Sequence, residues 1–428
     1  MKEELVKAAR RVLPKPAIKG LETVYRQNRA RAVAAKYGYP ARSLRVIAVT
    51  GTNGKTTTAN YLNEILKANG HTTALFSTAQ IELAGKKTLN DLNVTVATVD
   101  QMQRFFRDAK AAKADYVILE ATSHALDQYK LAGVPIECAI MTNLTQDHLD
   151  YHGTMDNYAA AKAKLFKMKP EFVVLNRDDD WFDYFNQFDG ESQKITYGTD
   201  DQADARITKV KLYKKGSEVE VTVDHQTELK LATALPGKFN VYNMSAAAAA
   251  AYLMHIDIEA IEQGVQNLEG VAGRFESIDV DKPYEVIVDY AHTPDALEKL
   301  LETIKSTTKN RMILVFGACG DRDKLKRPIM GRIAADLADR IVLTDEESYN
   351  EDPTEIRQMI MDGIVDGKGK AKTDEIEDRK EAIKKAMNIA RKGDVLVITG
   401  MGHEQFRVVK GKKIPWNDGE VVRELAQK

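Results

Sequence analysis

Residues 46–58 read Val-Ile-Ala-Val-Thr-Gly-Thr-Asn-Gly-Lys-Thr-Thr-Thr, and they join a strand rich in β-branched residues to a glycine-rich loop and a helix. In such a unit the backbone N–H groups of the loop surround phosphate oxygens, and the helix N-terminus adds roughly half a positive charge. Lys55 is expected to reach the β- and γ-phosphates of a nucleotide and Thr56 to bind Mg²⁺. Val49 replaces the first glycine of the general phosphate-loop pattern, so that match is incomplete. The predicted nucleotide-binding residues of this loop are Gly51, Thr52, Asn53, Gly54, Lys55, Thr56 and Thr57.

Short apolar strands alternate with helical stretches along most of the chain. These strands are expected at 46–50, 116–120, 138–142, 172–176, 286–289, 312–316, 340–344 and 395–399. The alternation predicts an α/β protein with mostly parallel sheets covered by helices. Residues 206–213 and 218–223 instead alternate with a period of two, which indicates antiparallel ribbons. We therefore expect a central P-loop ATPase domain at 45–272 and a C-terminal Rossmann-like α/β domain at 273–428.

Composition excludes several classes of protein. The 428 residues carry 62 Lys and Arg against 63 Asp and Glu, a formal net charge of -1, so the whole chain is not a nucleic-acid binder by charge. Two distant cysteines, Cys138 and Cys319, cannot form a disulfide framework or a cysteine-based zinc cluster. No apolar run approaches the roughly 20 residues of a membrane span. These features predict a cytoplasmic protein.

Residues 1–44 form a distinct basic segment. They are predicted to be helical with breaks at Pro14, Pro16 and Pro40. From Met1 to Arg45 there are twelve Lys and Arg but only three Glu. The plainer interpretation is a solvated helical arm packed on the next domain. The sharper one is a basic surface for a phosphate-bearing substrate or an anionic membrane.

Further motifs follow the phosphate loop in a fixed order. They are Glu-Ala-Thr-Ser-His-Ala-Leu at 120–126, Thr-Asn-Leu-Thr-Gln-Asp-His-Leu-Asp-Tyr-His-Gly at 142–153, Pro-Gly-Lys-Phe-Asn-Val-Tyr-Asn at 236–243, Gly-Arg-Phe-Glu at 273–276, Asp-Tyr-Ala-His-Thr-Pro-Asp-Ala-Leu at 289–297, Gly-Ala-Cys-Gly-Asp-Arg-Asp-Lys-Leu-Lys-Arg-Pro at 317–328 and Thr-Gly-Met-Gly-His-Glu at 399–404. Over residues 45–428 the set resembles the Mur ligase family, and its MurE type most closely. The resemblance implies an ATP-dependent, ADP-forming ligase that phosphorylates a carboxylate and lets an incoming amine displace the phosphate.

The resemblance also implies roles for individual residues. Lys55, Lys162 and Arg274 would be catalytic, and the Mg²⁺ ligands would be Thr56, Glu120, His148 and Lys162. ATP would meet Asn243 at the adenine, Arg274 at the γ-phosphate and Asp289 at the ribose, with His292 nearby. Lys162 matches a lysine that becomes carbamylated, which requires an unprotonated amine and hence a depressed pKa. Without the resemblance, Lys162 reads as a surface lysine of an Ala-rich helix, like Lys164. We assign His124 and His152 no catalytic role.

The predicted substrate residues fall into two groups. Thr95, Thr122, Gln128 and Lys130 match positions that contact the muramoyl peptide, whereas Tyr349, Gly400 and Glu404 would meet the incoming amino acid. Residues 346–349 stand where diaminopimelate-adding enzymes have Asp-Asn-Pro-Arg, so the arginine that clamps the distal carboxylate is a tyrosine here. Glu346 and Glu347 would favour a cationic group, so lysine or ornithine competes with meso-diaminopimelate as the added amino acid.

A second departure concerns the acceptor. MurE-type enzymes carry a separate N-terminal domain that holds uridine diphosphate, and residues 1–44 are too few to build it. We therefore expect the basic arm to replace that domain and a muramoyl-peptide acceptor, either UDP-linked or lipid-linked, to bind. Two alternatives stay open: a folylpolyglutamate synthase-like ligase, and a nucleotide-binding subunit of a two-component complex that modifies the cell wall.

Overall fold

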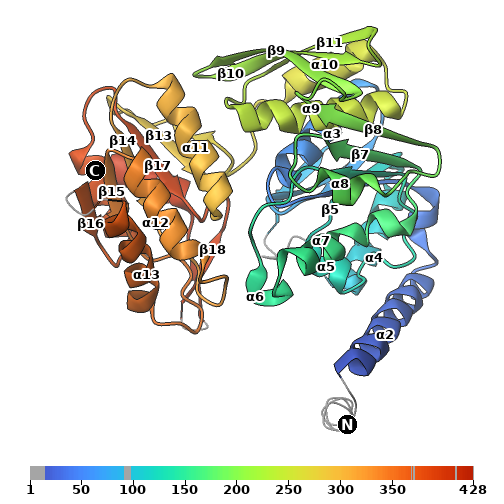
Figure 1. The fold of residues 1–428 in the computed structure, drawn as a ribbon, viewed down its shortest axis with the longest axis horizontal. Helices are drawn as coiled ribbons and strands as arrows, with labels where there is room; N and C mark the ends of the chain where they lie inside the picture. Colours follow the sequence, from blue (N-terminus) through green and yellow to red (C-terminus); the bar gives the residue numbers. More distant parts are fainter. Residues whose placement is uncertain (1–14, 91–97, 368, 370–371, 410–411, 428) are drawn as a thin grey trace.

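The computed structural model describes residues 15–90, 98–367, 369, 372–409 and 412–427. Two β-sheets organise this part of the chain, each with helices on both faces. Figure 1 shows them in separate halves, the first built from the blue to yellow-green elements and the second from the orange to red ones. This arrangement is the α/β fold that the strand pattern predicts.

The first sheet contains eleven strands among the described residues, in the order β11-β10-β9-β8-β7-β6-β1-β5-β2-β3-β4. The strands are β1 (Arg45–Thr50), β2 (Thr73–Phe76), β3 (Gln80–Leu83), β4 (Lys86–Leu89), β5 (Tyr116–Glu120), β6 (Cys138–Met141), β7 (Phe172–Asn176), β8 (Gln193–Gly198), β9 (Ala205–Tyr213), β10 (Gly216–Val223) and β11 (Thr227–Thr233). Pairing is parallel from β9 to β2 through β1, whereas β9-β10-β11 and β2-β3-β4 are antiparallel.

Helices bury both faces of this sheet. They are α3 (Lys55–Ala68), α4 (Val99–Ala111), α5 (Ser123–Asp127), α6 (Leu149–His152), α7 (Met155–Ala163), α8 (Phe182–Asn186), α9 (Lys238–Leu253) and α10 (Ile258–Asn267), with a short 3-10 helix η2 (Phe166–Met168). One core packs α3, α9 and α10 against the sheet, and the other packs α4, α5, α7 and α8. The alanines at 246–251 in α9 are all fully buried, which lets this helix lie close to the sheet and to α3.

The second sheet has the order β12-β13-β17-β14-β15-β16, and only β12 pairs antiparallel among its described strands. Its strands are β12 (Glu276–Ser277), β13 (Glu285–Asp289), β14 (Met312–Phe316), β15 (Arg340–Leu343), β16 (Thr373–Glu375) and β17 (Val395–Thr399). One face carries α11 (Pro294–Thr307), α12 (Lys326–Leu337) and α13 (Pro353–Asp366), and the other carries α14 (Arg379–Ile389) and α15 (Asp418–Ala426). A hairpin of β18 (Phe406–Val409) and β19 (Lys412–Pro415) follows β17.

The structure confirms the predicted strands and the antiparallel ribbon near 205–235, and it corrects one detail of the N-terminal arm. Helix α2 (Lys15–Lys36) runs through Pro16 instead of breaking there, because Pro16 lies in the first turn, where its missing N–H needs no partner. Pro40 opens a 3-10 helix, η1 (Pro40–Ser43). Pro14 lies outside the described residues. None of the described helices is both long and apolar enough to cross a bilayer.

The fold brings the carboxyl ends of the two parallel sheets toward one gap. β1 ends at the phosphate loop and β5 ends at Glu120, while β13 ends at Asp289 and Gly400 follows β17. Open α/β sheets bind ligands outside the carboxyl ends of their strands. The topology therefore directs two binding edges, one from each half of the chain, toward each other.

A fully buried ion pair joins the last two helices, α14 and α15. Arg379 of α14 donates to both carboxylate oxygens of Asp418 in α15, at 2.9 and 2.6 Å, and neither side chain is exposed. Removing one partner of such a pair leaves an uncompensated buried charge, which typically costs about 3–5 kcal/mol. We therefore expect Asp418→Ala to lower the free energy of unfolding by about that amount, measured by urea denaturation.

The adjacent pair between the same two helices supplies the control. Lys380 and Glu424 lie 2.6 Å apart with side chains 38% and 47% exposed. Glu424→Ala should change stability by less than about 1 kcal/mol. Equal effects of the two substitutions would contradict the stabilising role given to the buried pair.

Candidate active site

A cavity of about 1050 Å³ lies between the two halves of the chain. It brings together most of the residues that the sequence predicts to be functional. Those on its wall are Thr52, Asn53, Gly54, Lys55, Thr56, Thr57, Glu120, Thr122, Gln128, Lys130, His148, Asn243, Arg274, Asp289, His292, Tyr349, Gly400 and Glu404. Gly51, the first residue of the loop, and Lys162, which donates to its carbonyl from beneath, do not line the wall. Thr95 lies outside the described residues.

The phosphate loop packs tightly on the elements behind it. Gly54, with φ of +85°, precedes α3, and a Cβ atom there would lie 2.2 Å from Oδ1 of Asn243. Thr142 Oγ1 donates to the Asn53 carbonyl at 2.7 Å, and the Asn53 N–H donates to the side chain of Asn143 at 2.9 Å. The loop is therefore held from the end of β6 and from α9, and Gly54 is needed for its close approach to Asn243.

Two lysines share one carbonyl oxygen under this loop. Lys55 Nζ donates to the carbonyls of Gly51 at 3.1 Å and Thr52 at 2.7 Å, and Lys162 Nζ donates to the Gly51 carbonyl at 2.6 Å. Lys162 is 1% exposed and its amine lies 4.6 Å from the centre of the Tyr158 ring. Burial, reinforced by the nearby Lys55 charge, holds the pKa of Lys162 well below its ordinary value. The site thus favours a neutral amine at this position.

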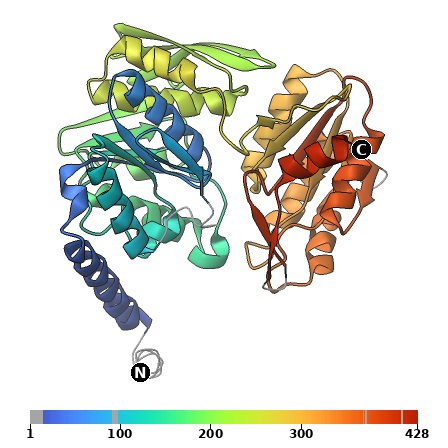
Figure 2. The same ribbon diagram turned by 180° about the vertical axis from the view of Figure 1, so that it is seen from behind.

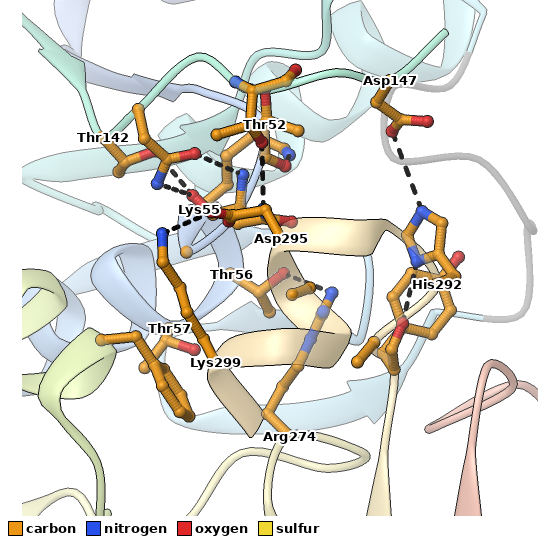
Figure 3. Close-up of a pocket in the computed structure, with 18 of the residues that line it drawn as sticks. Thr52, Lys55, Thr56, Thr57, Thr142, Asp147, Arg274, His292, Asp295 and Lys299 are labelled. Carbon is orange, nitrogen blue, oxygen red and sulfur yellow. Dashed lines mark hydrogen bonds and ion pairs between the residues drawn. The ribbon is translucent and has the colours of Figure 1, made fainter. Parts of the chain in front are cut away.

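The other predicted metal ligands are each held by a neighbour. Glu120 is 1% exposed, and its two oxygens accept hydrogen bonds from the backbone N–H and the hydroxyl of Thr78, both at 2.8 Å. Thr56 Oγ1 accepts a hydrogen bond from Arg274 Nη2 at 3.2 Å (Figure 3). This bond joins α3 of one half to the start of the other half.

A buried charge cluster also connects the two halves. Asp147 lies 3.2 Å from Nε2 of His148, 3.9 Å from Nε2 of His292 and 3.5 Å from Nζ of Lys326, and Figure 3 shows its contact with His292. Burial alone would raise the pKa of Asp147, but Lys326 and the two histidines outweigh it and lower that pKa. Burial lowers the pKa of His148 to about 3, so its imidazole is neutral, as a metal ligand requires.

The loop makes one more contact across the cavity. Asn53 Nδ2 donates to Asp295 Oδ2 at 2.8 Å, and Lys299 pairs with the other oxygen of Asp295 at 2.7 Å (Figure 3). Asp289 lines the cavity too, with its oxygens accepting from the backbone N–H groups of Phe275 at 2.6 Å and Ala291 at 2.7 Å. The carboxylate thus caps the turn before α11 while Asp289 still lines the cavity.

The part of the cavity near Tyr349 and Gly400 corrects one expectation. Glu347 lines the wall and accepts from the Tyr349 hydroxyl and the Val408 N–H, both at 2.9 Å. Glu346 does not line the wall, contrary to our expectation that it would face a cationic group. Its side chain is buried behind Gly400, where an added Cβ atom would lie 1.9 Å from its carboxylate. Only Glu347 of this pair lines the cavity, because the Glu346 carboxylate is turned to the Gly317 N–H and the Cys319 thiol.

Sequence reasoning missed one residue of this end, Arg322. It lines the cavity, and its guanidinium lies 5.2 Å from the centre of the Tyr349 ring. The Gly-Asp-Arg-Asp run at 320–323 was the available sign, but the spacing did not tell which of its charges faces inward. Glu404 also lines the wall, where burial and the Glu347 charge raise its pKa to about 7.

The donor set fits Mg²⁺ in the presence of a nucleotide. The described residues hold no cluster of three or more His, Cys, Asp or Glu placed for a metal ion. Mg²⁺ is usually bound by one or two protein oxygens together with substrate phosphates and water, so such a cluster is not required. The hydroxyl of Thr56 and the carboxylate of Glu120 on one cavity wall are suitable hard ligands.

Family models match both halves of the chain. The model of the Mur ligase middle domain matches residues 49–251, and the model of the Mur ligase glutamate ligase domain matches residues 273–402. The chain is 39% identical over 400 residues to the UDP-N-acetylmuramoyl-L-alanyl-D-glutamate–2,6-diaminopimelate ligase of Syntrophomonas wolfei, covering 92% of this chain and 81% of that protein. It is 37% identical to the ligase of the same name from Halalkalibacterium halodurans, covering 93% and 82%.

Solved structures show the same likeness. A UDP-N-acetylmuramoyl-L-alanyl-D-glutamate–2,6-diaminopimelate ligase matches with a TM-score of 0.62 and 35% identity, over 90% of this chain and 78% of that one. Folylpolyglutamate synthase of Mycobacterium tuberculosis matches with a TM-score of 0.73, but at 18% identity, over 94% of both chains. The second likeness concerns the fold alone.

The geometry at Glu120 and His148 generates a prediction for Mg-ATP-dependent turnover. Because a bound metal typically supplies several kcal/mol of transition-state stabilisation, Glu120→Ala and His148→Ala should each slow turnover by about a hundredfold or more. Steady-state ADP release at saturating substrates would measure this. A defect below about tenfold would exclude that residue from the metal site.

Glu137 provides a matched control. Glu137 directly precedes β6 and pairs with Arg45, the first residue of β1. Both residues lie at the amino ends of the strands, whereas Glu120 lies at a carboxyl end. Glu137→Ala should therefore leave ADP release unchanged.

Proposed function

This chain belongs to the Mur ligase family, and we propose that it is an ATP-dependent, ADP-forming ligase that adds a diamino acid to a muramoyl-peptide precursor of the cell wall. The observation that carries the proposal is the shared cavity, where the phosphate loop of one half and Arg274 of the other meet at Thr56. The named activity of the relatives from Syntrophomonas wolfei and Halalkalibacterium halodurans supports the same reaction class.

The first step transfers a phosphoryl group. A carboxylate oxygen of the acceptor attacks the γ-phosphorus of ATP, the bond to the bridging oxygen breaks, and ADP leaves. Lys55 and Arg274 supply fixed positive donors for the transferring oxygens, and Arg274 stays protonated throughout. Bound Mg²⁺ would neutralise phosphate charge, held by Thr56, Glu120 and His148. Asn243 and Asp289 would position the adenine and the ribose.

The second step forms the amide. The amine of the incoming amino acid attacks the acyl carbon, and phosphate leaves with the former carboxylate oxygen. That amine must first lose a proton. Glu404 lines the cavity and has a pKa of about 7, which suits it to accept a proton near neutral pH. We propose that Glu404 holds the amine and takes this proton.

The acceptor and the amino acid would enter from opposite sides. Thr122, Gln128 and Lys130, at the α5 side of the cavity, would hold the muramoyl peptide. Arg322 and Glu347 flank Tyr349 at the other side. A guanidinium there suits the α-carboxylate of an amino acid, and the Glu347 carboxylate suits a second ammonium group. This pairing favours lysine or ornithine at least as much as meso-diaminopimelate.

The remaining expectations complete the proposal. We infer a division into an arm at 1–44, an ATP-binding domain at 45–272 and an amino-acid-binding domain at 273–428. We expect the enzyme to act in the cytoplasm. The described residues of α2 do not line the cavity, so a phosphate grip by the arm stays a prediction. Of the alternatives, the nucleotide-binding subunit is disfavoured because Lys55, Glu120, His148, Lys162 and Arg274 are all present.

We propose that Lys162 acts as a carbamate anion at the metal site. Lys162→Ala should then abolish ligation while retaining the binding of a non-hydrolysable ATP analogue, because the phosphate loop itself is intact. High bicarbonate or an added short carboxylate should partly restore turnover of the variant, measured as ADP release. Lys164→Ala is the control, since Lys164 lies two residues away and pairs with Asp127 at 2.8 Å. Near-normal turnover of Lys162→Ala would refute the assignment.

The amino-acid preference depends on Tyr349. Losing an arginine–carboxylate pair at a buried site typically costs roughly 2–5 kcal/mol, so the native chain should show little preference for diaminopimelate over lysine or ornithine. Tyr349→Arg should raise kcat/KM for diaminopimelate relative to lysine. Glu347→Gln should lower kcat/KM for lysine. As a control, Val365→Arg, at an exposed position of α13, should leave kcat/KM for both amino acids unchanged. A strong diaminopimelate preference of the native chain would contradict this interpretation.

A further inference from the structure

Helix α2 is attached to the body of the protein by its second half only. Ala30 and Ala34 are 1% and 3% exposed, and the Tyr37 hydroxyl that follows the helix donates to Asp100 of α4 at 3.1 Å. The first half projects away from the sheet and its helices, as both views in Figures 1 and 2 show. The outward side of α2 therefore has no covering element among the described residues.

Large apolar side chains occupy that outward side. Leu21, Val24 and Tyr25 are 59%, 55% and 56% exposed, and their spacing of three and four residues places them on one face of the helix. The same face continues through Ala32 and Ala35, which are also exposed. A soluble helix normally turns such a stripe toward a core. An apolar stripe turned outward on a projecting helix indicates a binding surface.

Basic residues flank the stripe. Helix α2 contains six Lys and Arg and a single acidic residue, Glu22, which pairs with Arg26 at 3.5 Å. Arg29 and Arg31 are exposed and have no ion-pair partner in the part of the chain that the structure describes. An apolar face bordered by Lys and Arg is the composition of helices that lie in the headgroup region of anionic membranes.

We propose that α2 docks on an anionic membrane surface, with Leu21, Val24 and Tyr25 entering the headgroup boundary and Arg29 and Arg31 contacting lipid phosphates. A second copy of the chain fits this face less well, because two strongly basic helices would repel each other along their length. An acidic bilayer supplies both an apolar phase and the opposite charge.

The location of α2 relates this surface to the cavity. Arg26 lies close enough to the Tyr151 hydroxyl to affect its pKa, although burial is the main cause of the rise in that pKa. Tyr151 belongs to α6, which begins directly after His148 on the cavity wall. Docking through α2 would therefore hold the acceptor side of the cavity near the lipid surface. The proposal itself does not depend on the ligase activity.

The test is co-sedimentation of the full chain with vesicles of phosphatidylcholine alone or with 30% phosphatidylglycerol. We expect binding to the anionic vesicles only, weakened by salt. The triple variant Leu21→Ser, Val24→Ser, Tyr25→Ser should lose most of it, and Arg29→Gln with Arg31→Gln should weaken it by roughly tenfold or more. The control pair Val210→Ser and Val365→Ser removes exposed apolar side chains elsewhere, at 39% and 46% exposure, and should bind like the native chain.

Other outcomes would overturn the proposal. Equal binding to neutral and anionic vesicles, no binding to either, or undiminished binding of the triple variant would each exclude this role for α2. Light scattering of the same protein samples tests whether a second copy of the chain covers this face instead. If the native chain is a dimer and the triple variant is a monomer, the face is a dimer interface. Circular dichroism would show that each variant is folded, and no substrate is needed, so a failed ligase proposal would leave this result interpretable.

Discussion

The shared hydrogen bonding of the Gly51 carbonyl is the constraint on which the site depends. One oxygen accepts from both Lys55 and Lys162, with the second amine fully enclosed beneath the loop. Two ammonium groups at one buried oxygen repel each other, so the arrangement favours a neutral Lys162, whose pKa burial holds well below its ordinary value, whereas burial lowers the pKa of Lys55 less far. A neutral amine can form a carbamate, whereas a surface lysine at its ordinary pKa is protonated and cannot.

The second requirement is that the two sheets share one cavity. Contacts at Thr56–Arg274, Asn53–Asp295 and Asp147–Lys326 all cross between the halves and all surround the phosphate loop. Neither sheet edge alone offers both a phosphate cradle and an amine-binding carboxylate. In the proposed reaction the chemistry would take place where the two halves meet, in a cavity that would also keep water from a reactive acyl intermediate.

Much of the fold follows from local sequence, whereas several site details depend on long-range packing. The β-branched runs predicted the parallel strands, and the loop predicted to hold the nucleotide lines the cavity between the two halves. The short polar strands β3 and β4 escaped prediction because their pattern is weak over four residues. Whether Glu346 or Glu347 lines the cavity, and whether Lys162 is buried, depends on contacts with Gly400 and Gly51, which lie far away along the chain. Charge marked the N-terminal arm as unusual, but only the structure shows that its apolar stripe is turned outward.

Every role proposed for a residue of the cavity serves the formation or the capture of an acyl phosphate. The most direct measurement uses a muramoyl dipeptide whose acceptor carboxylate is labelled with ¹⁸O, incubated with ATP, Mg²⁺ and each diamino acid. Mass spectrometry of the released phosphate reports where the label goes. The account predicts one ¹⁸O atom in the phosphate for each amide formed, since the carboxylate oxygen leaves with the phosphoryl group. Amide formation with unlabelled phosphate, or phosphate release that requires no acceptor, would contradict it.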